Sequence, residues 1–506
     1  GQALSSVLLL ESIDLPNRSE ASASLTTVFV GAGFQNLAKN KKSSFGINYG
    51  YTNLLPYFSI VKQKPDYFAM PEFHSSDANF RIKTKKGGMI KYYTTFASSQ
   101  LGLRNADIDS ANLKNAFGLN NLNWYNNLSY RENLSNGWKM QLGLSYSTNV
   151  DKITNTIQNQ QNQPVTTSVG YINNKNFALK STQDLSQVRA VFEKRIKGIS
   201  AARFGAEYWY ANNKTEFNNY TSVLKDHFQS VFAEADIYVS NALAIKAGGR
   251  FEYSSILKKS NIAPRISLAY KAGNNAQMSL AYGEFYQKPE NNQLVNNSTG
   301  KPLQIGYTKA THYLINYIKT TSLQTFRVEA YYKKYNNLVK TFPDTNTLGI
   351  GYAQGFELFW RDKKTIKNID YWISYSYLDT KRDYQNFPSQ LQPTFATPHT
   401  FNVVAKNFVT KWKTGFNATY TFATGRPYYN IAYSGSKYEI KDEGTTKSFH
   451  NLGISLNYLP NLGKQNAKTF IVLVASVTNA LNFNQEYGYR YSYNGQNKVA
   501  VTPPAK

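Results

Sequence analysis

The side chains best suited to metal binding or catalysis are scattered along this chain and form no motif. The five histidines are His74, His227, His312, His399 and His450. Their spacing matches neither the H-E-x-x-H pattern of a zinc site nor any related ligand pattern, and no G-x-S-x-G nucleophile turn occurs. The chain has 0 cysteines, which excludes thiolate metal sites and disulfide bonds. We therefore expect no catalytic residue, no metal site and no cofactor.

Charged residues that alternate with apolar ones are a second candidate for function. Arg250 and Glu252, for example, alternate with Phe251 and Tyr253. Charges with this spacing lie on one face of a strand, where they can bind a second surface through ion pairs and hydrogen bonds. The residues selected in this way are Arg203, Glu207, Lys246, Arg250, Glu252, Arg265, Arg327, Glu329 and Glu357.

Tyrosines in or beside predicted loops are a third candidate group. The long link 52–67 is aromatic and contains proline. Such a link can capture a ligand, pack against a neighbouring domain or simply order itself, and the residues leave these alternatives open. The candidate ligand contacts are Tyr57, Tyr67, Tyr286 and Tyr428.

The elements that must position these side chains are β-strands. Apolar and polar residues alternate strictly over segments of about 8–13 residues, which is the pattern of a strand with two different faces. In 138–146, one face carries Trp138, Met140, Leu142, Leu144 and Tyr146. No stretch of comparable length has helical periodicity, and no aliphatic run approaches the ~20 residues of a spanning helix. The chain is predicted to be all-β.

The links between the predicted strands alternate between short and long. Tight links are expected at 135–137, 197–198, 240–241, 273–275, 321–324, 363–368 and 410–411, with an intermediate one at 257–264. Long links are expected near 150–177, 213–225, 288–308, 340–352, 381–397 and 425–447. An antiparallel transmembrane β-barrel has this arrangement, with short periplasmic turns and longer extracellular loops.

The number of predicted strands sets the size of the barrel. Segments from Ser5–Asp14 to Thr469–Asn482 give about 21 strands. A closed bacterial barrel has an even number of strands, so we expect about 22, with the closing strand absent from this chain. Residues 1–506 are then one barrel domain, and a barrel of that size can hold a plug in its lumen.

Energetics decide which face meets lipid. A Lys or Arg in the middle of the lipid face costs about 2–4 kcal/mol, so the charged faces should line the lumen and the apolar faces should contact outer-membrane lipid. His312 and His450, each at a strand start, fit a girdle or lumen position. A soluble sheet is the alternative, but a single core rarely exceeds roughly 250–300 residues, and the sequence shows no linkers.

The positive charge of the chain does not indicate a nucleic-acid partner. The formal net charge is +26, from 57 Lys and Arg against 31 Asp and Glu. The lysines are spread over the whole chain, and no compact basic module or RNA-binding motif is present. The excess could still concentrate anionic ligands at a positive vestibule.

Several segments resemble the barrel of TonB-dependent outer-membrane receptors. Gly248–Ser254 resembles the family's G-x-R-x-E-Y strand, Ala263–Tyr270 its S-P-R-x-x-L-x-Y strand, and Leu280–Pro289 the strand S-Y-G-x-F-x-Q-x-P that follows. Lys309–Tyr313, Thr424–Tyr428 and Val477–Asn482 are similar to later elements, in the expected order. Each motif alone is weak, but the ordered series is specific.

The resemblance implies an active importer in the outer membrane of a Gram-negative bacterium. In that family a plug fills the barrel, and the TonB–ExbB–ExbD complex acts on the plug. Here the N-terminal plug and the closing aromatic-ended strand are expected to be absent, with Gly1–Leu10 resembling the plug–barrel junction. The nine charged residues named above would then hold the plug from the barrel wall.

The resemblance also gives an expectation for the ligand. A ferric siderophore or another metal chelate is the commonest cargo of the family. The barrel also looks short beside the glycan importers of the starch-utilisation type, but aromatic loops suit sugars as well. A passive porin or an adhesin without a plug is the next alternative, and an outer-membrane enzyme comes third.

Overall fold

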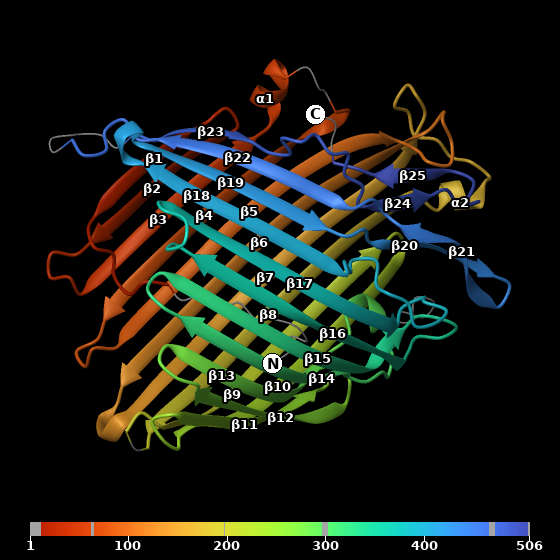
Figure 1. Cartoon of the computed structure of the whole chain (residues 1–506). Helices are drawn as coiled ribbons and strands as arrows, with labels where there is room; N and C mark the ends of the chain where they lie inside the picture. The colour runs from red at the N-terminus through yellow and green to blue at the C-terminus, as the bar shows by residue number, and fades with distance from the viewer. Residues whose placement is uncertain (1–11, 62–64, 197, 296–301, 465–470, 504–506) are drawn as a thin grey trace.

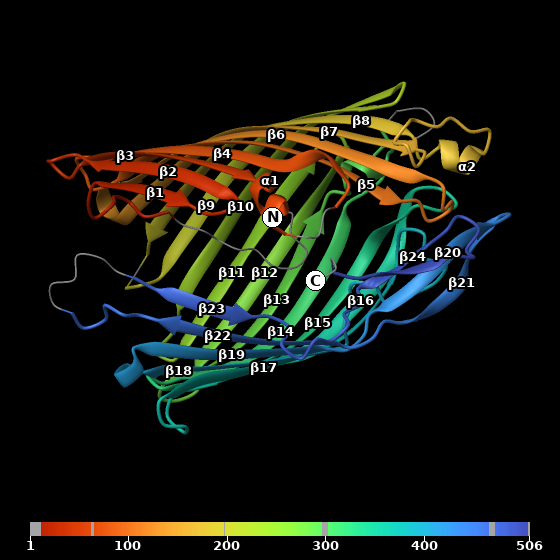
Figure 2. The ribbon, with the colours of Figure 1, turned by 90° about the horizontal axis from the view of Figure 1, so that it is seen from above.

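The structure, a computed structural model, describes residues 12–61, 65–196, 198–295, 302–464 and 471–503. Its strands form one 21-stranded antiparallel sheet that curves around a central space (Figure 1). In the second view, β2 to β8 lie along one wall and β17, β18, β19, β22 and β23 along the opposite wall, with the other strands of the sheet joining them (Figure 2). The prediction of an antiparallel barrel with about 21 strands in this chain is confirmed.

The first half of the large sheet consists of β1 (Glu20–Leu25), β2 (Phe29–Leu37), β3 (Ser43–Asn53), β4 (Tyr67–Lys83), β5 (Met89–Ala106), β6 (Lys114–Asn133), β7 (Trp138–Gln158), β8 (Phe177–Arg195), β9 (Ala201–Phe217), β10 (Tyr220–Tyr238) and β11 (Leu243–Ser254). The second half consists of β12 (Lys259–Lys271), β13 (Ala276–Gln287), β14 (Thr308–Thr320), β15 (Gln324–Lys340), β16 (Asn346–Asp362), β17 (Ile369–Asp383), β18 (His399–Val409), β19 (Thr414–Ala423), β22 (Phe449–Tyr458) and β23 (Leu473–Val477).

Among the described residues, two small hairpins and two short α-helices lie outside this sheet, and three 3-10 turns, Ser135–Gly137, Asn291–Gln293 and Thr410–Trp412, lie in its links. The hairpins are β20 (Pro427–Ser434) with β21 (Lys437–Thr445), and β24 (Gly488–Tyr491) with β25 (Lys498–Val501). The helices are α1 (Leu55–Ile60) and α2 (Gly170–Asn173). Across the described ranges, none of the helices has the length and apolar character needed to span a membrane.

Neighbouring strands pair in chain order, except that β19 pairs with β22 across the β20–β21 hairpin. Most pairings keep one register from end to end, as in β9–β10, where Phe217 lies opposite Tyr220 and Ala201 opposite Asp236. An unbroken register keeps each side chain on one face of the sheet. Within the described residues, β1 pairs only with β2 and β23 only with β22.

The alternation of short and long links is confirmed, with three corrections. The 340–352 link was expected to be long, but β15 ends at Lys340 and β16 begins at Asn346, which leaves only residues 341–345. The 213–225 segment was expected to be a long loop, but β9 and β10 run through it and leave a two-residue link at 218–219. The 257–264 link is also shorter than expected, because β12 begins at Lys259. Residues 211–217 are mostly polar on both faces of β9. They therefore lack the alternation of apolar and polar residues by which a strand is recognised in the sequence. The first predicted strand, 5–14, lies largely outside the described residues.

Burial distinguishes the two faces of the sheet. In β10, the side chains of 222, 224, 226, 228 and 230 are buried, whereas those between them are exposed. Large apolar side chains such as Phe204, Val231 and Phe251 are exposed on the opposite face. In a barrel, the exposed apolar face meets lipid, so the buried, charge-bearing face is the inner one.

Candidate functional site: the luminal wall and the loop rim

One ion-pair network lies near the short-turn end of the inner wall, and Arg203 is at its centre. The register places Arg203 opposite Glu193 on β8 and Glu234 on β10. Arg203 donates to Glu193 over 2.6 Å, to Asp236 over 2.8 Å and to Glu234 over 3.2 Å. Lys246 of β11 contacts the carboxylates of Glu234 and Asp236 at 3.3 and 3.4 Å. Five adjacent strands therefore share one polar layer, since Lys139 of β7 also reaches Glu193.

A second network, closer to the loops, is more deeply buried. Arg250 donates through its η2 nitrogen to Glu207 and through Nε to Glu252, both over 2.6 Å. The Glu252 side chain is 1% exposed and that of Arg250 is 10% exposed. Arg189 adds a contact to Glu207 at 3.0 Å. Buried charges are stable only when they are paired and hydrogen-bonded, and this network meets that requirement.

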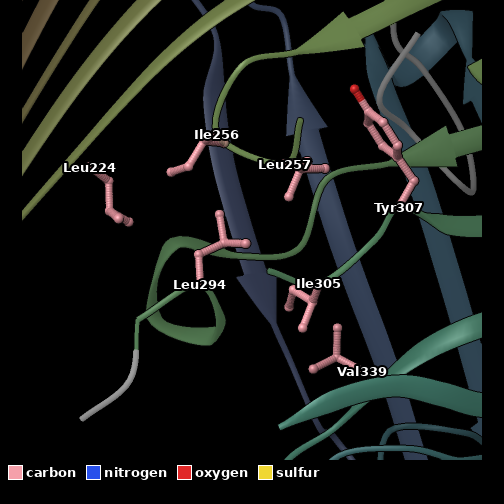
Figure 3. Close-up of a cluster of buried hydrophobic side chains, with 7 residues drawn as sticks. All are labelled: Leu224, Ile256, Leu257, Leu294, Ile305, Tyr307 and Val339. Atoms are coloured by element: carbon pink, nitrogen blue, oxygen red, sulfur yellow. The ribbon is translucent and has the colours of Figure 1, made fainter. Parts of the chain in front are cut away.

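Above this network the inner wall changes from charged to apolar. Asp226 accepts hydrogen bonds from Lys288 over 2.6 Å and from the Ser254 hydroxyl over 2.9 Å. Beside it lies a buried cluster formed by β10, β15 and the links after β11 and β13 (Figure 3). Its members are Leu224, Ile256, Leu257, Leu294, Ile305, Tyr307 and Val339. The packing fixes these links against the wall.

Arg265 is a cation of a different kind on the same wall. Its guanidinium lies 4.5 Å from the centre of the Phe285 ring, and among the described residues no carboxylate lies within 4 Å of it. A Cβ at Gly283 would be 3.0 Å from that ring, so the G-x-F spacing leaves room for the stack. Arg265 lines a hollow of about 620 Å³ with Arg189, Lys246, Arg250 and two carboxylates, Glu207 and Glu234. The hollow is net positive and open to an anionic group.

The other three predicted wall residues lie apart from these networks, on β15 and β16. Glu329 lies directly opposite Glu357 in the register, and it accepts a hydrogen bond from Asn316 over 3.2 Å. Arg327 stacks over Phe359 with 6.0 Å to the ring centre. The structure therefore groups six of the nine residues, Arg203 to Arg265, on β9 to β12, and places the remaining three on a second patch of wall.

The four loop tyrosines do not converge on one place. Tyr57 lies on α1 and Tyr67 begins β4, and both rings contact Phe58, at 5.3 and 5.6 Å. Tyr286 is the penultimate residue of β13, where its hydroxyl donates to Glu284 over 3.2 Å. Tyr428 lies on β20, with its ring 4.6 Å from Tyr489. They mark three separate positions at the loop side.

Lys498 joins the two hairpins of the loop rim. Its ammonium donates to Asp442 of β21 and to the Tyr428 hydroxyl, both over 2.8 Å. It also lies over the Tyr428 and Tyr489 rings, at 4.1 and 4.5 Å. The hydrogen bond with Asp442, followed by that with Tyr428, raises the pKa of Lys498 above its ordinary range. Burial, assisted by Asp442, raises the pKa of Tyr491 to about 12.

The β24–β25 hairpin also reaches loops from the other end of the sheet. The Tyr493 ring stacks on Tyr171 of α2, with 4.5 Å between centres and 3° between planes. The Tyr493 amide donates to Asp109 over 2.6 Å. Lys175 bonds Asp107 and Asp109 at 2.6 Å each. Although burial of Asp107 acts in the opposite direction, the hydrogen bonds from Lys175 and Asn115 lower its pKa.

Sequence reasoning missed the partners of the wall arginines and both rim hairpins. Two of these partners, Arg189 and Glu193, lie at every-second-residue spacing on β8 with Val191 between them on the same face. This spacing is a signal that could have identified both. The contact of Lys288 with Asp226 spans 62 residues and leaves no local signal. In the described ranges, no group of three or more His, Asp or Glu side chains is arranged to hold a metal ion. His312 faces the lumen, with its ring 4.6 Å from that of Phe285, and His450 lies on the outer face.

Comparison with known proteins identifies the family. Residues 72–480 match the family described as TonB dependent receptor-like, beta-barrel. The chain therefore belongs to this family, whose members are transporters. A comparison of the sequence with curated proteins finds no match.

Solved structures with the same fold are distant in sequence. The outer membrane transporter YddB from Escherichia coli has a TM-score of 0.68 and 10% identity, covering 94% of this chain and 73% of that one. A point mutant of the ferric enterobactin receptor PfeA from Pseudomonas aeruginosa has a TM-score of 0.69 and 10% identity over 95% and 76%. The ferric yersiniabactin uptake receptor FyuA from Yersinia pestis has a TM-score of 0.68 and 10% identity over 97% and 78%. At these identities the likeness establishes the fold.

Proposed function

We propose that this chain is the barrel of an outer-membrane importer for a ferric siderophore or another anionic metal chelate. The observation that carries the proposal is the net positive hollow on the inner wall, where Arg265 has no carboxylate within 4 Å among the described residues. A positive site at a low-dielectric wall concentrates anions. Two proteins of similar fold are a ferric enterobactin receptor and a ferric yersiniabactin uptake receptor.

The charged wall would also hold a plug, on which TonB, energised by ExbB and ExbD, would pull to open the lumen. In this proposal the plug contacts are Arg203, Glu207, Lys246, Arg250, Glu252, Arg265, Arg327, Glu329 and Glu357. Five of these residues, Arg203, Glu207, Lys246, Arg250 and Glu252, already have ion-pair partners on the wall. Arg265 differs, because it can accept a new carboxylate without breaking an existing pair.

The plug proposal is tested in the whole receptor with Arg265→Gln, alone and combined with Arg250→Gln. We expect weaker plug retention, measured as greater passive entry of a large antibiotic into cells. Lys139→Gln is the matched control, because its side chain is 52% exposed. Unchanged uptake together with unchanged leakage in the double variant would reject the role of the wall.

Cargo is tested by uptake of labelled ferric chelates in cells that carry or lack the gene, with and without a functional TonB. TonB-dependent accumulation of a chelate supports the proposal. Exposed rim tyrosines, with Tyr433 58% and Tyr493 76% exposed, favour a glycan as the second candidate. Accumulation of an oligosaccharide instead would select that candidate, and entry independent of TonB would select a passive porin.

A further inference from the structure

Four of the five histidines lie on the outer face of the barrel in the same arrangement. In each case a tyrosine hydroxyl on the neighbouring strand is hydrogen-bonded to Nδ1 of the imidazole. The pairs are Tyr49–His74 at 2.9 Å, Tyr208–His227 at 2.7 Å, Tyr375–His399 at 2.7 Å and Tyr420–His450 at 2.9 Å. A second aromatic ring lies directly opposite each imidazole in the register: Tyr51, Tyr210, Tyr377 and Phe422.

The four pairs also lie at the same height. Each tyrosine is six or seven residues beyond the start of its strand at the short-turn side, at Ser43, Ala201, Ile369 and Thr414. On β10 the apolar outer stripe runs from Ile237 to Val231, and His227 lies ten residues from Ile237. Ten residues at ~3.3 Å, tilted by ~40°, span about 25 Å, the height of the apolar band of an outer-membrane barrel. The imidazoles therefore lie where the band meets the headgroups of the loop-side leaflet.

The hydrogen bond from tyrosine determines what each imidazole presents to the surroundings. A phenol is a far weaker base than an imidazole, so the hydroxyl donates and Nδ1 accepts. The proton of the neutral ring is then on Nε2, which points away from the tyrosine as a donor. In His74 this nitrogen is bonded to Glu72 at 2.9 Å, and the His450 ring is stacked on Phe483 at 4.6 Å.

His227 is different because it is exposed and has a cation beside it. Lys225 lies two residues nearer the loops on the same face of β10, and both side chains are exposed. Within the described ranges, neither residue has a carboxylate within 4 Å. The surrounding outer charges are Lys180 and Lys214, which pair with Glu216, and Asp184, which accepts hydrogen bonds from Asn212 and Tyr146. The patch is net positive and offers two outward donors.

We infer that His227 and Lys225, framed by the rings of Tyr208 and Tyr210, bind the phosphate of a phosphorylated glycolipid headgroup in the loop-side leaflet. Lysine binds phosphate as a point charge, and charge-assisted hydrogen bonds to phosphate are stronger than neutral ones. The tyrosine bond holds the imidazole in the donating tautomer before any lipid arrives. This inference rests on the proposed place of the barrel in the outer membrane and not on its cargo.

The test uses the full receptor in nanodiscs and counts retained glycolipids by native mass spectrometry. The probe is a diphosphorylated glycolipid, compared with its dephosphorylated form and with inorganic phosphate. We expect His227→Phe with Lys225→Gln to weaken retention of the phosphorylated form about tenfold, or about 1.4 kcal/mol. The dephosphorylated form should bind equally to parent and variant.

Matched controls separate this site from general effects. His450→Phe removes an imidazole that is also hydrogen-bonded to a tyrosine but whose ring is stacked on Phe483. Lys85→Gln removes a lysine at the short-turn side of the barrel. Neither variant should change retention of the phosphorylated glycolipid. Heat-modifiable migration on a gel verifies that each variant is folded. The inference is overturned if the double variant retains the glycolipid as the parent does, if removal of the phosphates has no effect, or if only inorganic phosphate binds. Failure of chelate uptake would leave this result intact, so the two proposals fail separately.

Discussion

At the scale of single residues, the inner wall shows how charges are accommodated in a barrel. Arg203 lies opposite Glu193 and Glu234 in the register. Arg250 instead bonds Glu252, two positions along β11, and reaches Glu207 on β9 across β10. Cross-strand neighbours in register have Cβ atoms within ~5.5 Å, so a guanidinium can reach two strands at once. This reach explains why Glu207 can be shared by Arg189 and Arg250.

Arg250→Gln should destabilise the barrel by about 3–5 kcal/mol, because it removes the cation that bonds the buried Glu252, while Arg189 still pairs with Glu207. The measurement is urea unfolding in detergent, followed by tryptophan fluorescence. Lys139→Gln is the control and should change stability by about 0.5 kcal/mol or less, because its partner Glu193 keeps Arg203. Equal midpoints for the two variants would show that the Arg250 network contributes no special stability.

Much of the wall could be predicted from sequence, because period-two alternation assigns Arg203, Arg250 and Arg265 to a face without knowledge of their partners. The partners are harder to predict. Glu193 and Asp236 become neighbours of Arg203 only once the links after β8 and β9 fix the register. The Asp226–Lys288 pair forms because the link after β13 packs against the inner wall. No pattern of neighbouring residues in the sequence predicts this packing.

At the scale of elements, the loop side is more ordered than its polar composition indicates. The 424–448 link contains a complete hairpin, and the segment after β23 contains another. Their strands are too short for the alternation of apolar and polar residues to distinguish them from loops. Short aromatic contacts between the hairpins, such as Tyr428 with Tyr489, supply packing that neither hairpin has alone.

The anchor between the 107–113 and 159–176 loops should depend on pH. The pKa of Asp107 in the folded chain is below its ordinary value of 3.8, so its contribution is present above that value and is lost as pH falls through the lowered pKa. Hydrogen exchange of 159–176, corrected for intrinsic rates, should show protection at pH 7 that disappears well below pH 4.

Asp107→Asn should expose the same loop at pH 7, because Lys175 then loses a charged partner. Asp77→Asn provides a carboxylate control on β4, whose acceptor contact is with Asn48 at some distance from this loop. Protection of 159–176 that is unchanged in Asp107→Asn would argue that the loop is held by packing alone.

At the scale of the whole molecule, the short and long links should lie on opposite sides of a membrane. The chain has 0 cysteines, so one introduced cysteine reports one position without background. Gly435→Cys, in the β20–β21 turn, should react in intact cells with a membrane-impermeant maleimide. Lys411→Cys, in the β18–β19 turn, should react only after the outer membrane is permeabilised. Labelling of both positions in intact cells would contradict the predicted topology.

The stack of Tyr493 on Tyr171 also has a consequence for the order of folding. Tyr493 bonds Asp109, which precedes it by 384 residues. A contact across so much chain is slow to form unless the intervening chain already brings its ends together. The 21-stranded sheet does this by curving until its first and last thirds face each other. The rim contact can therefore close only after nearly every strand has paired, which makes it a late event that reports that assembly is almost finished.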